Sequence, residues 1–242
     1  MPRTLPLGSS FVPIREADIG ARLAGLRERI AAAARGCDRT PAEIGLVAVS
    51  KKQPPEAVAA AWAAGQHRFG ESYLQEALAK IAILGHLAVD WHFIGRVQSN
   101  KTRALAEAFD WLHSLADLRH AERLSAQRPA GRAPLNVCLQ VNLTGEASKA
   151  GLARTAVPAV ARAVAALPGL RLRGLMTMTD PADTPQDQRN TFHRLRALRD
   201  NLNVDGLALD TLSMGMSDDL EAAICEGATL VRVGTAIFGP RD

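Results

Sequence analysis

Eight short apolar segments alternate with helix-forming segments along most of this 242-residue chain. Repeated strand–helix units imply parallel strands joined by right-handed crossovers, because the helices then cover the sheet. Eight such units in this length favour an α/β fold of the closed (β/α)8 TIM barrel type, with an open doubly wound sheet as the alternative. The expected strands are 44–50, 67–70, 90–95, 110–115, 135–142, 170–178, 208–215 and 229–234.

An extra amphipathic helix is expected before the first strand. Between residues 15 and 35 the apolar residues Ile19, Leu23, Leu26 and Ile30 recur at a spacing of three or four. This spacing places them on one face of a helix, which would pack against the barrel.

The sequence predicts a single domain. No stretch rich in proline, glycine and serine divides it, so residues 15–242 are expected to form the barrel and residues 1–14 a flexible N-terminal tail. No segment is long and apolar enough to span a membrane, and the first 20 residues lack the apolar core of a signal peptide. We therefore expect a cytoplasmic protein without membrane contact.

The composition argues against several kinds of partner. The net charge of +4 comes mostly from arginines mixed with carboxylates, and aromatic residues for base stacking make up only 4%, so no nucleic-acid partner is expected. Cys37, Cys138 and Cys225 are odd in number and widely spaced, which predicts reduced and mostly buried thiols. The six histidines show no metal-binding spacing, so no metal is expected.

Two adjacent lysines follow the first expected strand. Pro54 and Pro55 prevent this strand from continuing, so Lys51 and Lys52 lie at its C-terminal end, where barrels carry their active sites. One interpretation is that both lysines are exposed loop residues. The other is that one lies in a pocket, where desolvation or a nearby cation lowers its pKa and the free amine becomes a nucleophile. The residues alone do not choose between the two lysines.

The loops after the seventh and eighth expected strands are rich in small and hydroxyl residues. Barrels often bind phosphate through these two loops, which here supply Ser213, Gly215, Gly234 and Thr235. Small residues let the backbone approach an anion closely. Ser217 is expected to be a helix N-cap, and a plain capped helix is the alternative interpretation of its loop.

Arg232 lies near the end of the last expected strand, between Val231 and Val233, so alternation could place it inside the barrel mouth. A buried cation needs a partner, either a barrel carboxylate or a cofactor. An amine, a phosphate cradle and a buried cation together describe a site for pyridoxal 5′-phosphate (PLP), with Arg232 at the ring nitrogen. An arginine there keeps the nitrogen unprotonated, which weakens the ring as an electron sink.

Other residues of interest lie on or at the ends of expected strands. Glu71 either orients a neighbour or caps a helix. His92 is interpreted as a satisfied core residue in preference to an acid or base. Asn142 and Met176 end apolar strands and either line a ring pocket or complete the core.

Six segments together resemble the pyridoxal phosphate homeostasis protein family, a group of alanine-racemase-like barrels. They are VAVSKKQP, HRFGESYLQEALAK, WHFIGRVQSNK, VNLTGEASKAGL, RGLMTM and LSMGMSDDLEAAICEGATLVRVGTAIFG. The resemblance implies that Lys51 is the Schiff-base lysine. It also implies phosphate contacts at Ser213, Gly234 and Thr235, Arg232 beside the ring, and a pocket lined by Asn142, Met176 and Met214.

The resemblance further implies a fold type III PLP-protein-like barrel whose members have no established reaction. Lys52 and Arg96 depart from the family pattern, which affects the local loops beside the pocket. Alanine racemases add a C-terminal β-domain that supplies a catalytic tyrosine, and we expect no such domain here, where Tyr73 is the only tyrosine. We expect a monomeric PLP carrier that buffers or delivers the cofactor, with apo PLP-dependent enzymes as recipients. The alternative is a weak PLP-dependent amino-acid racemase.

Overall fold

The computed structural model of the protein describes residues 16–145, 149–180 and 182–239. The tail predicted at 1–14 lies outside these ranges. None of the described helices is long and apolar enough to cross a membrane.

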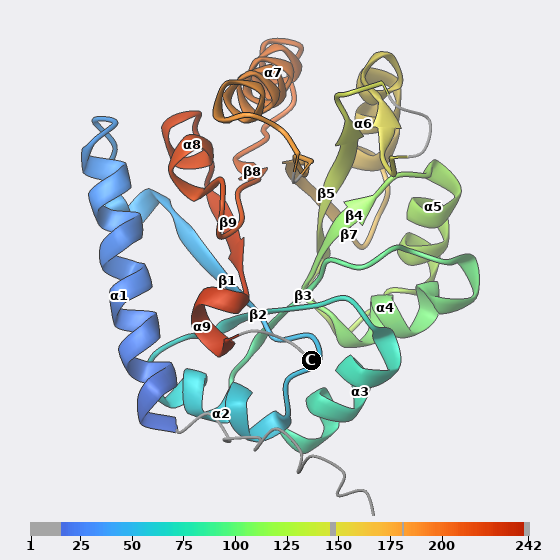
Figure 1. The fold of residues 1–242 in the computed structure, drawn as a ribbon. Helices are drawn as coiled ribbons and strands as arrows, with labels where there is room; N and C mark the ends of the chain where they lie inside the picture. The colour runs from blue at the N-terminus through green and yellow to red at the C-terminus, as the bar shows by residue number, and fades with distance from the viewer. Residues whose placement is uncertain (1–15, 146–148, 181, 240–242) are drawn as a thin grey trace, which may run out of the picture.

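Eight parallel strands form a closed barrel (Figure 1). Each strand pairs with the next one around the ring, and the pairing of the fourth strand with the fifth completes the circle. Closure confirms the predicted TIM barrel over the open sheet. In ring order the strands are β1 (Gly45–Val49), β2 (Arg68–Glu71), β3 (Asp90–Phe93), β4 (Trp111–Leu115), β5 (Leu135–Asn142), β7 (Leu170–Met176), β8 (Thr211–Ser213) and β9 (Leu230–Val233).

The eight predicted strands are all present, although several are shorter than expected. The segment predicted at 208–215 forms a strand only over Thr211–Ser213, because it pairs with β7 at three positions and with β9 at one. The sequence analysis missed β6 (Leu152–Ala153), which pairs with the end of β5. Two residues are too few for a periodic pattern to reveal a strand.

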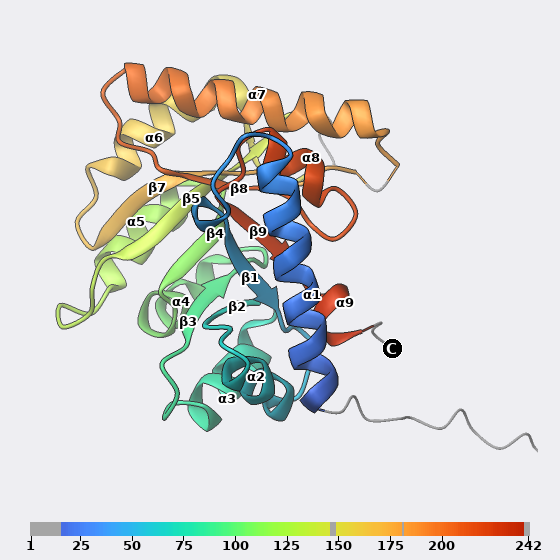
Figure 2. The ribbon, with the colours of Figure 1, turned by 90° about the vertical axis from the view of Figure 1, so that its left-hand side faces the viewer.

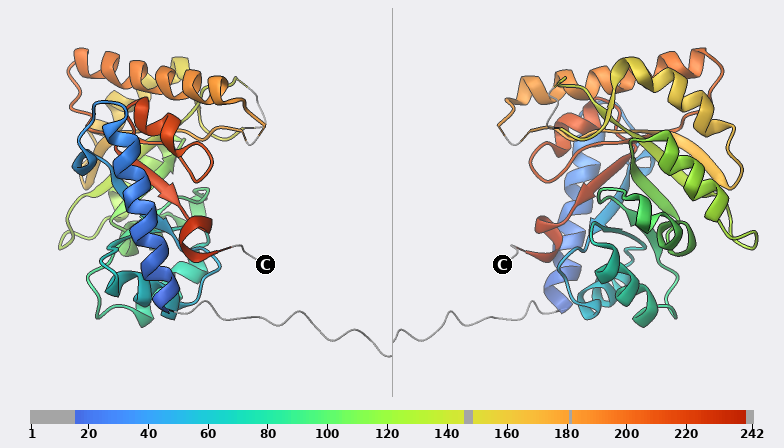
Figure 3. Two further views of the ribbon diagram at one scale, coloured as in Figure 1. Left: turned by 60° about the vertical axis from the view of Figure 1, so that its left-hand side comes forward. Right: turned by 90° about the vertical axis from the view of Figure 1, so that its right-hand side faces the viewer.

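Helices surround the barrel and connect its strands, as the alternation predicted. Pro55 and Pro185 stand at helix starts, where the missing N–H of proline is not needed. The longest connecting helix, α7, lies crosswise to the first helix of the chain (Figure 3). The connecting helices are α2 (Pro55–Ala63), α3 (Leu74–Ile83), α4 (Thr102–Ala108), α5 (Leu118–Gln127), α6 (Val157–Ala165), α7 (Pro185–Val204) and α8 (Leu220–Cys225), and α9 (Thr235–Phe238) follows the last strand.

The predicted extra helix is α1 (Glu16–Arg35). Its four periodic residues Ile19, Leu23, Leu26 and Ile30 are all buried. They face the barrel where α1 packs against α2, α8 and α9 (Figure 2). This helix therefore covers the side on which the first and last strands meet.

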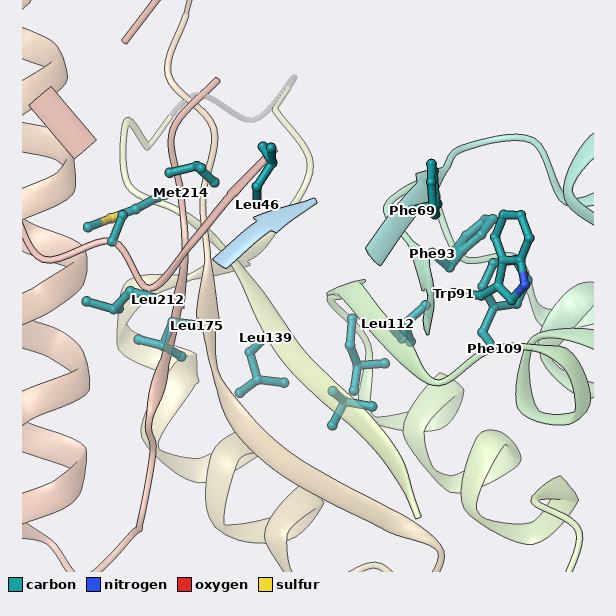
Figure 4. Packing of buried hydrophobic residues seen from close by; sticks show 14 of the residues in the cluster. Leu46, Phe69, Trp91, Phe93, Phe109, Leu112, Leu139, Leu175, Leu212 and Met214 are labelled. Atoms are coloured by element: carbon teal, nitrogen blue, oxygen red, sulfur yellow. The ribbon is translucent and has the colours of Figure 1, made fainter. Parts of the chain in front are cut away.

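Apolar side chains fill the layer between the barrel and its helices (Figure 4). Trp91 and Phe93 of β3 point outward into this layer, and Phe93 packs edge-on against Phe109 with ring centroids 5.3 Å apart. Because side chains alternate along a strand, His92 points to the opposite face, into the barrel. His92 is a fully buried core residue, as predicted, and its Nδ1 bonds to His113, but its Nε2 has no hydrogen-bond partner among the described residues.

A disulfide joins Cys37, just after α1, to Cys225 at the end of α8. The prediction that these two cysteines are reduced thiols is wrong. The two lie 188 positions apart in the sequence, and only the packing of α1 against α8 brings their Cα atoms to 5.3 Å. Cys138 is a free, buried thiol, and burial raises its pKa to about 12.

Reduction of the Cys37–Cys225 disulfide should lower the free energy of unfolding by about 2–4 kcal/mol, because it returns conformational freedom to the unfolded chain. Thermal unfolding with and without reductant measures the change, and Cys225→Ser should be insensitive to reductant. A thiol reagent should count one reactive group, Cys138, in denatured unreduced protein. Three reactive groups before reduction would contradict the pairing.

Candidate functional site at the mouth of the barrel

A cavity of about 540 Å³ opens where the strands end at their carboxyl side. This is the end at which TIM barrels carry their active sites. The ends of β1 and β9 lie side by side there, with α9 directly after β9 (Figure 1). Five of the nine predicted cofactor residues line this cavity: Lys51, Met176, Arg232, Gly234 and Thr235.

Lys51 lies in a tight turn after β1. The N–H of Gln53 donates to the carbonyl oxygen of Ser50 at 3.0 Å and closes the turn, and Lys52 adopts a left-handed φ of 62°. This conformation costs a non-glycine residue roughly 1–2 kcal/mol, so surrounding contacts must hold it. Lys52 is exposed, whereas Lys51 lines the cavity. The structure thus distinguishes two lysines that the residues alone left equivalent.

A buried ion cluster holds this turn in place. Lys80 of α3 donates from Nζ to the carbonyl oxygen of Ser50 at 2.7 Å, and to Glu71 Oε1 at 2.8 Å and Glu76 Oε1 at 2.6 Å. Glu76 Oε1 also accepts the backbone N–H of Lys52 at 2.5 Å. The backbone of Ser50 and that of Lys52 therefore bond to the same cluster, which fixes the position of the Lys51 backbone between them.

Glu71, at the end of β2, orients neighbours and caps no helix. Its side chain is fully buried, and Oε1 accepts the Ser50 hydroxyl at 2.7 Å as well as the Lys80 ammonium. The N-cap of α3 is Tyr73. Burial raises the pKa of Glu71, although the hydrogen bond from Lys80 acts in the opposite direction.

Arg232 forms the deep wall of the cavity. Its side chain is almost fully buried, with Nη1 donating to Ser213 Oγ at 2.7 Å and Nη2 donating to the carbonyl oxygen of Thr177 at 3.0 Å. Burial lowers its pKa to about 10. Among the described residues it forms no ion pair with a carboxylate, so the barrel carboxylate considered from sequence is not its direct partner.

Four predicted residues do not line this cavity. Ser213 and Met214 are fully buried behind the wall, where Ser213 supports Arg232. Gly215 lies in the same loop with a φ of 97°, and a Cβ there would come within 2.6 Å of the Ala223 side chain. Asn142 lines a neighbouring cavity of about 470 Å³. The contacts predicted between these four residues and a cofactor stay predictions, because none of the four lines the cavity that contains Lys51.

Ser217 is the residue that the sequence analysis placed in the wrong role. The helix α8 begins at Leu220 with Asp219 as its N-cap, and Ser217 lines the cavity instead. Asp219 makes no side-chain capping bond, and its carboxylate instead accepts the N–H of Met216 and the hydroxyl of Thr179, both at 2.5 Å. Ser217, Asp218 and Asp219 are all of residue types that favour helix caps, and no local feature of the sequence distinguishes them.

Arg29 is a further cavity residue that the sequence did not reveal. It comes from α1, and its guanidinium bonds to Glu221 at 2.6 Å and to the carbonyl oxygen of Ser217 at 2.9 Å. This ion pair is partly exposed, so its main effect is to tie the serine loop to the covering helix.

The donor set of the cavity fits PLP. An amine, Lys51, faces the same space as the hydroxyls of Ser217 and Thr235, with the backbone of Gly234 beside them and Arg232 at the deep end. These groups can react with an aldehyde, bind a phosphate and face a ring nitrogen, respectively.

The chain is similar to several known proteins. Residues 22–242 match the family described as "Alanine racemase, N-terminal domain". The pyridoxal phosphate homeostasis protein of Pseudomonas aeruginosa is 58% identical over 224 residues, which cover 93% of this chain and 96% of that protein. The Escherichia coli K12 protein of the same name is 49% identical over 228 residues, which cover 93% and 97%. The chain belongs to the pyridoxal phosphate homeostasis protein family.

Solved structures with a similar fold include one relative and one enzyme. PipY of Synechococcus elongatus PCC7942, solved with PLP bound, has a TM-score of 0.81 and 39% identity, covering 91% of this chain and all of PipY. Alanine racemase from Corynebacterium glutamicum has a TM-score of 0.72 at 18% identity, covering 95% of this chain and 62% of the racemase. The second likeness shows a shared fold alone.

Lys80→Met should destabilise the protein by about 3–5 kcal/mol, because the substitution leaves Glu71 and Glu76 without their buried cation. Urea unfolding measures the loss. Lys101→Met is the matched control, since Lys101 forms no ion pair among the described residues, and it should change stability by less than about 0.5 kcal/mol. Equal stability of the two variants would show that the cluster does not hold the turn.

Proposed function

We propose that this protein binds PLP as a Schiff base on Lys51 and takes part in PLP homeostasis, buffering or delivering the cofactor without strong catalytic turnover. The observation that carries the proposal is the shared cavity of Lys51 and Arg232, in a chain whose family relatives are named for PLP homeostasis. The PLP-bound state of PipY supports the choice of ligand.

Each part of the cavity has a distinct role in this proposal. The amine of Lys51 condenses with the cofactor's aldehyde, with loss of one water. The hydroxyls of Ser217 and Thr235 and the backbone at Gly234 bind the phosphate, while Met176 forms an apolar wall beside the ring. Arg232 faces the ring nitrogen, which it keeps unprotonated because a guanidinium can only donate. PLP supplies an electron sink in enzymes, and this contact weakens it.

The proposed carrier role extends to location, assembly and partners. We propose a cytoplasmic monomer whose recipients are apo PLP-dependent enzymes. The Cys37–Cys225 disulfide is unusual for that compartment, so thiol counting bears on the location as well.

A weak amino-acid racemase is the second candidate, favoured by the barrel fold shared with alanine racemase. Two-sided proton exchange needs an acid or base on each face of the cofactor. Lys51 supplies one, and Asp218 is the one carboxylate among the described cavity-lining residues. Tyr73 is half exposed and does not line the cavity.

Wild-type protein mixed with PLP should show the absorption band of an imine, and Lys51→Ala should lose it. Lys52→Ala is the matched control, because this lysine is adjacent in sequence but exposed. Borohydride reduction followed by peptide mapping should place the pyridoxyl adduct on Lys51. An adduct on Lys52, or a band that survives in Lys51→Ala, would refute the proposed anchor.

Racemisation should remain no faster than with free PLP. Incubation of the PLP-loaded protein with L-alanine and other amino acids, followed by chiral chromatography, measures this rate. Sustained turnover above the free-cofactor rate that disappears in Lys51→Ala would replace the carrier role with the racemase role.

A further inference from the structure

A file of hydrogen-bonded side chains runs through the barrel interior from Arg232. Arg232 Nη1 lies 2.7 Å from Ser213 Oγ, which lies 2.7 Å from His113 Nδ1. His113 Nε2 lies 2.7 Å from His92 Nδ1, and His92 Nε2 lies 3.3 Å from Asp90 Oδ2. The last contact is the longest and falls short of a hydrogen bond, so His92 Nε2 has no hydrogen-bond partner among the described residues.

The file connects the two mouths of the barrel. Its members come from β9, β8, β4 and β3, and β4 is not a neighbour of β8 in the sheet, so the contact between His113 and Ser213 crosses the barrel interior. Arg232 lines the cavity at the carboxyl ends of the strands. Asp90 is the first residue of β3 and lines the surface at the opposite mouth, with its side chain 35% exposed.

The chemistry of the two ends decides the direction of every hydrogen bond between them. Arg232 can only donate, so Ser213 Oγ accepts from it. An ionised Asp90 can only accept, so His92 donates from Nε2. A neutral imidazole has one donor and one acceptor, so His92 Nδ1 accepts from His113 Nε2, and His113 Nδ1 accepts the Ser213 hydroxyl. Every hydrogen bond in the file then joins one donor to one acceptor, and the N–H at His92 Nε2 faces the Asp90 carboxylate.

Both histidines are neutral in this arrangement. Burial lowers the pKa of His92, with Asp90 opposing the change, and the groups acting on His92 from the surrounding elements are Asp90, Asp110 and Arg68. Burial lowers the pKa of His113 strongly, with His92 and Arg232 adding to the effect. A charged His92 would place two N–H groups against each other between the histidines, and a charged His113 would lose its acceptor for the Ser213 hydroxyl.

The file also gives the buried guanidinium an electrostatic partner. Hydrogen bonds that all point one way polarise one another, with the negative end of each group directed toward Arg232 and the positive end toward Asp90. Arg232 has no ion pair among the described residues, so this oriented file links its charge to a carboxylate at the far mouth.

We propose that Asp90, His92 and His113 are positioning residues for the cofactor site, which act through Ser213 to hold Arg232 cationic and oriented toward the bound ring. The proposal rests on the proposed function, because it concerns the ring-nitrogen end of the same cavity. It predicts that removing a charge at the far mouth of the barrel weakens the hold on PLP.

The first experiment reads the proton positions directly in cofactor-free protein. Long-range ¹H–¹⁵N spectra should show His92 and His113 as neutral tautomers with the proton on Nε2. In Asp90→Asn both signals should shift. Asp210→Asn is the matched control, because Asp210 lies at the same mouth but pairs with Arg173 outside the file, and it should leave both signals in place. A proton on Nδ1 of His113 would overturn the proposed direction.

The second experiment measures PLP affinity and the absorption band of the bound cofactor. Asp90→Asn should raise the dissociation constant at least about 5-fold, the lower end of typical coupling between sites, and move the band. Asp210→Asn should change neither. Equal behaviour of the two variants would overturn the coupling.

The two proposals can fail separately. Wild-type protein that forms no imine on Lys51 would refute the proposed function and the coupling to PLP, while the tautomers would still decide whether the file exists. Wild-type binding with an unaffected Asp90→Asn variant would refute only the coupling. Thermal unfolding of each variant shows whether any loss of binding reflects a loss of fold.

Discussion

The pairing of the first strand with the last determines where the candidate site of this protein lies. The parallel ladder between β1 and β9 sets Val47 opposite Arg232 and Ala48 opposite Val233. Continuing both strands by a few residues brings the turn of Lys51 beside the loop of Gly234 and Thr235. Without the pairing of β1 with β9, Lys51 and the loop of Gly234 and Thr235 would lie at opposite edges of an open sheet. Helix α1 covers the side of the barrel where β1 and β9 meet, and the Cys37–Cys225 disulfide links the end of α1 to α8.

Buried charges mark both ends of the candidate site. Lys80 and Glu71 are almost completely buried below the turn of Lys51, and Arg232 is buried at the deep wall. Burying charge is costly even when it is paired, and apolar residues of similar size often stabilise a fold as well. Their placement at the carboxyl ends of the strands therefore points to positioning of the lysine and the guanidinium.

Local sequence patterns predicted much of the fold. They failed where neighbouring residues had the same local properties. Alternating segments predicted the closed barrel, and the spacing of Ile19 and Leu23 predicted the buried face of α1. Ser217 was predicted to be the N-cap of α8, but Asp219, two residues later, occupies that position, and both residue types favour helix caps. The amide of Asn142 bonds to the carbonyl oxygen of Lys149 beside a second cavity, a contact with no local signature.

The sequence by itself determined the number of barrel strands, the amphipathic helix and the presence of lysines at a strand's end, because these depend on residues a few positions apart. Only the tertiary structure decided which lysine faces the cavity, that Cys37 meets Cys225, and that Ser213 supports Arg232 from behind. Each of these depends on contacts between segments far apart in the chain. Such contacts exist only once the barrel closes, and residue type alone cannot specify them.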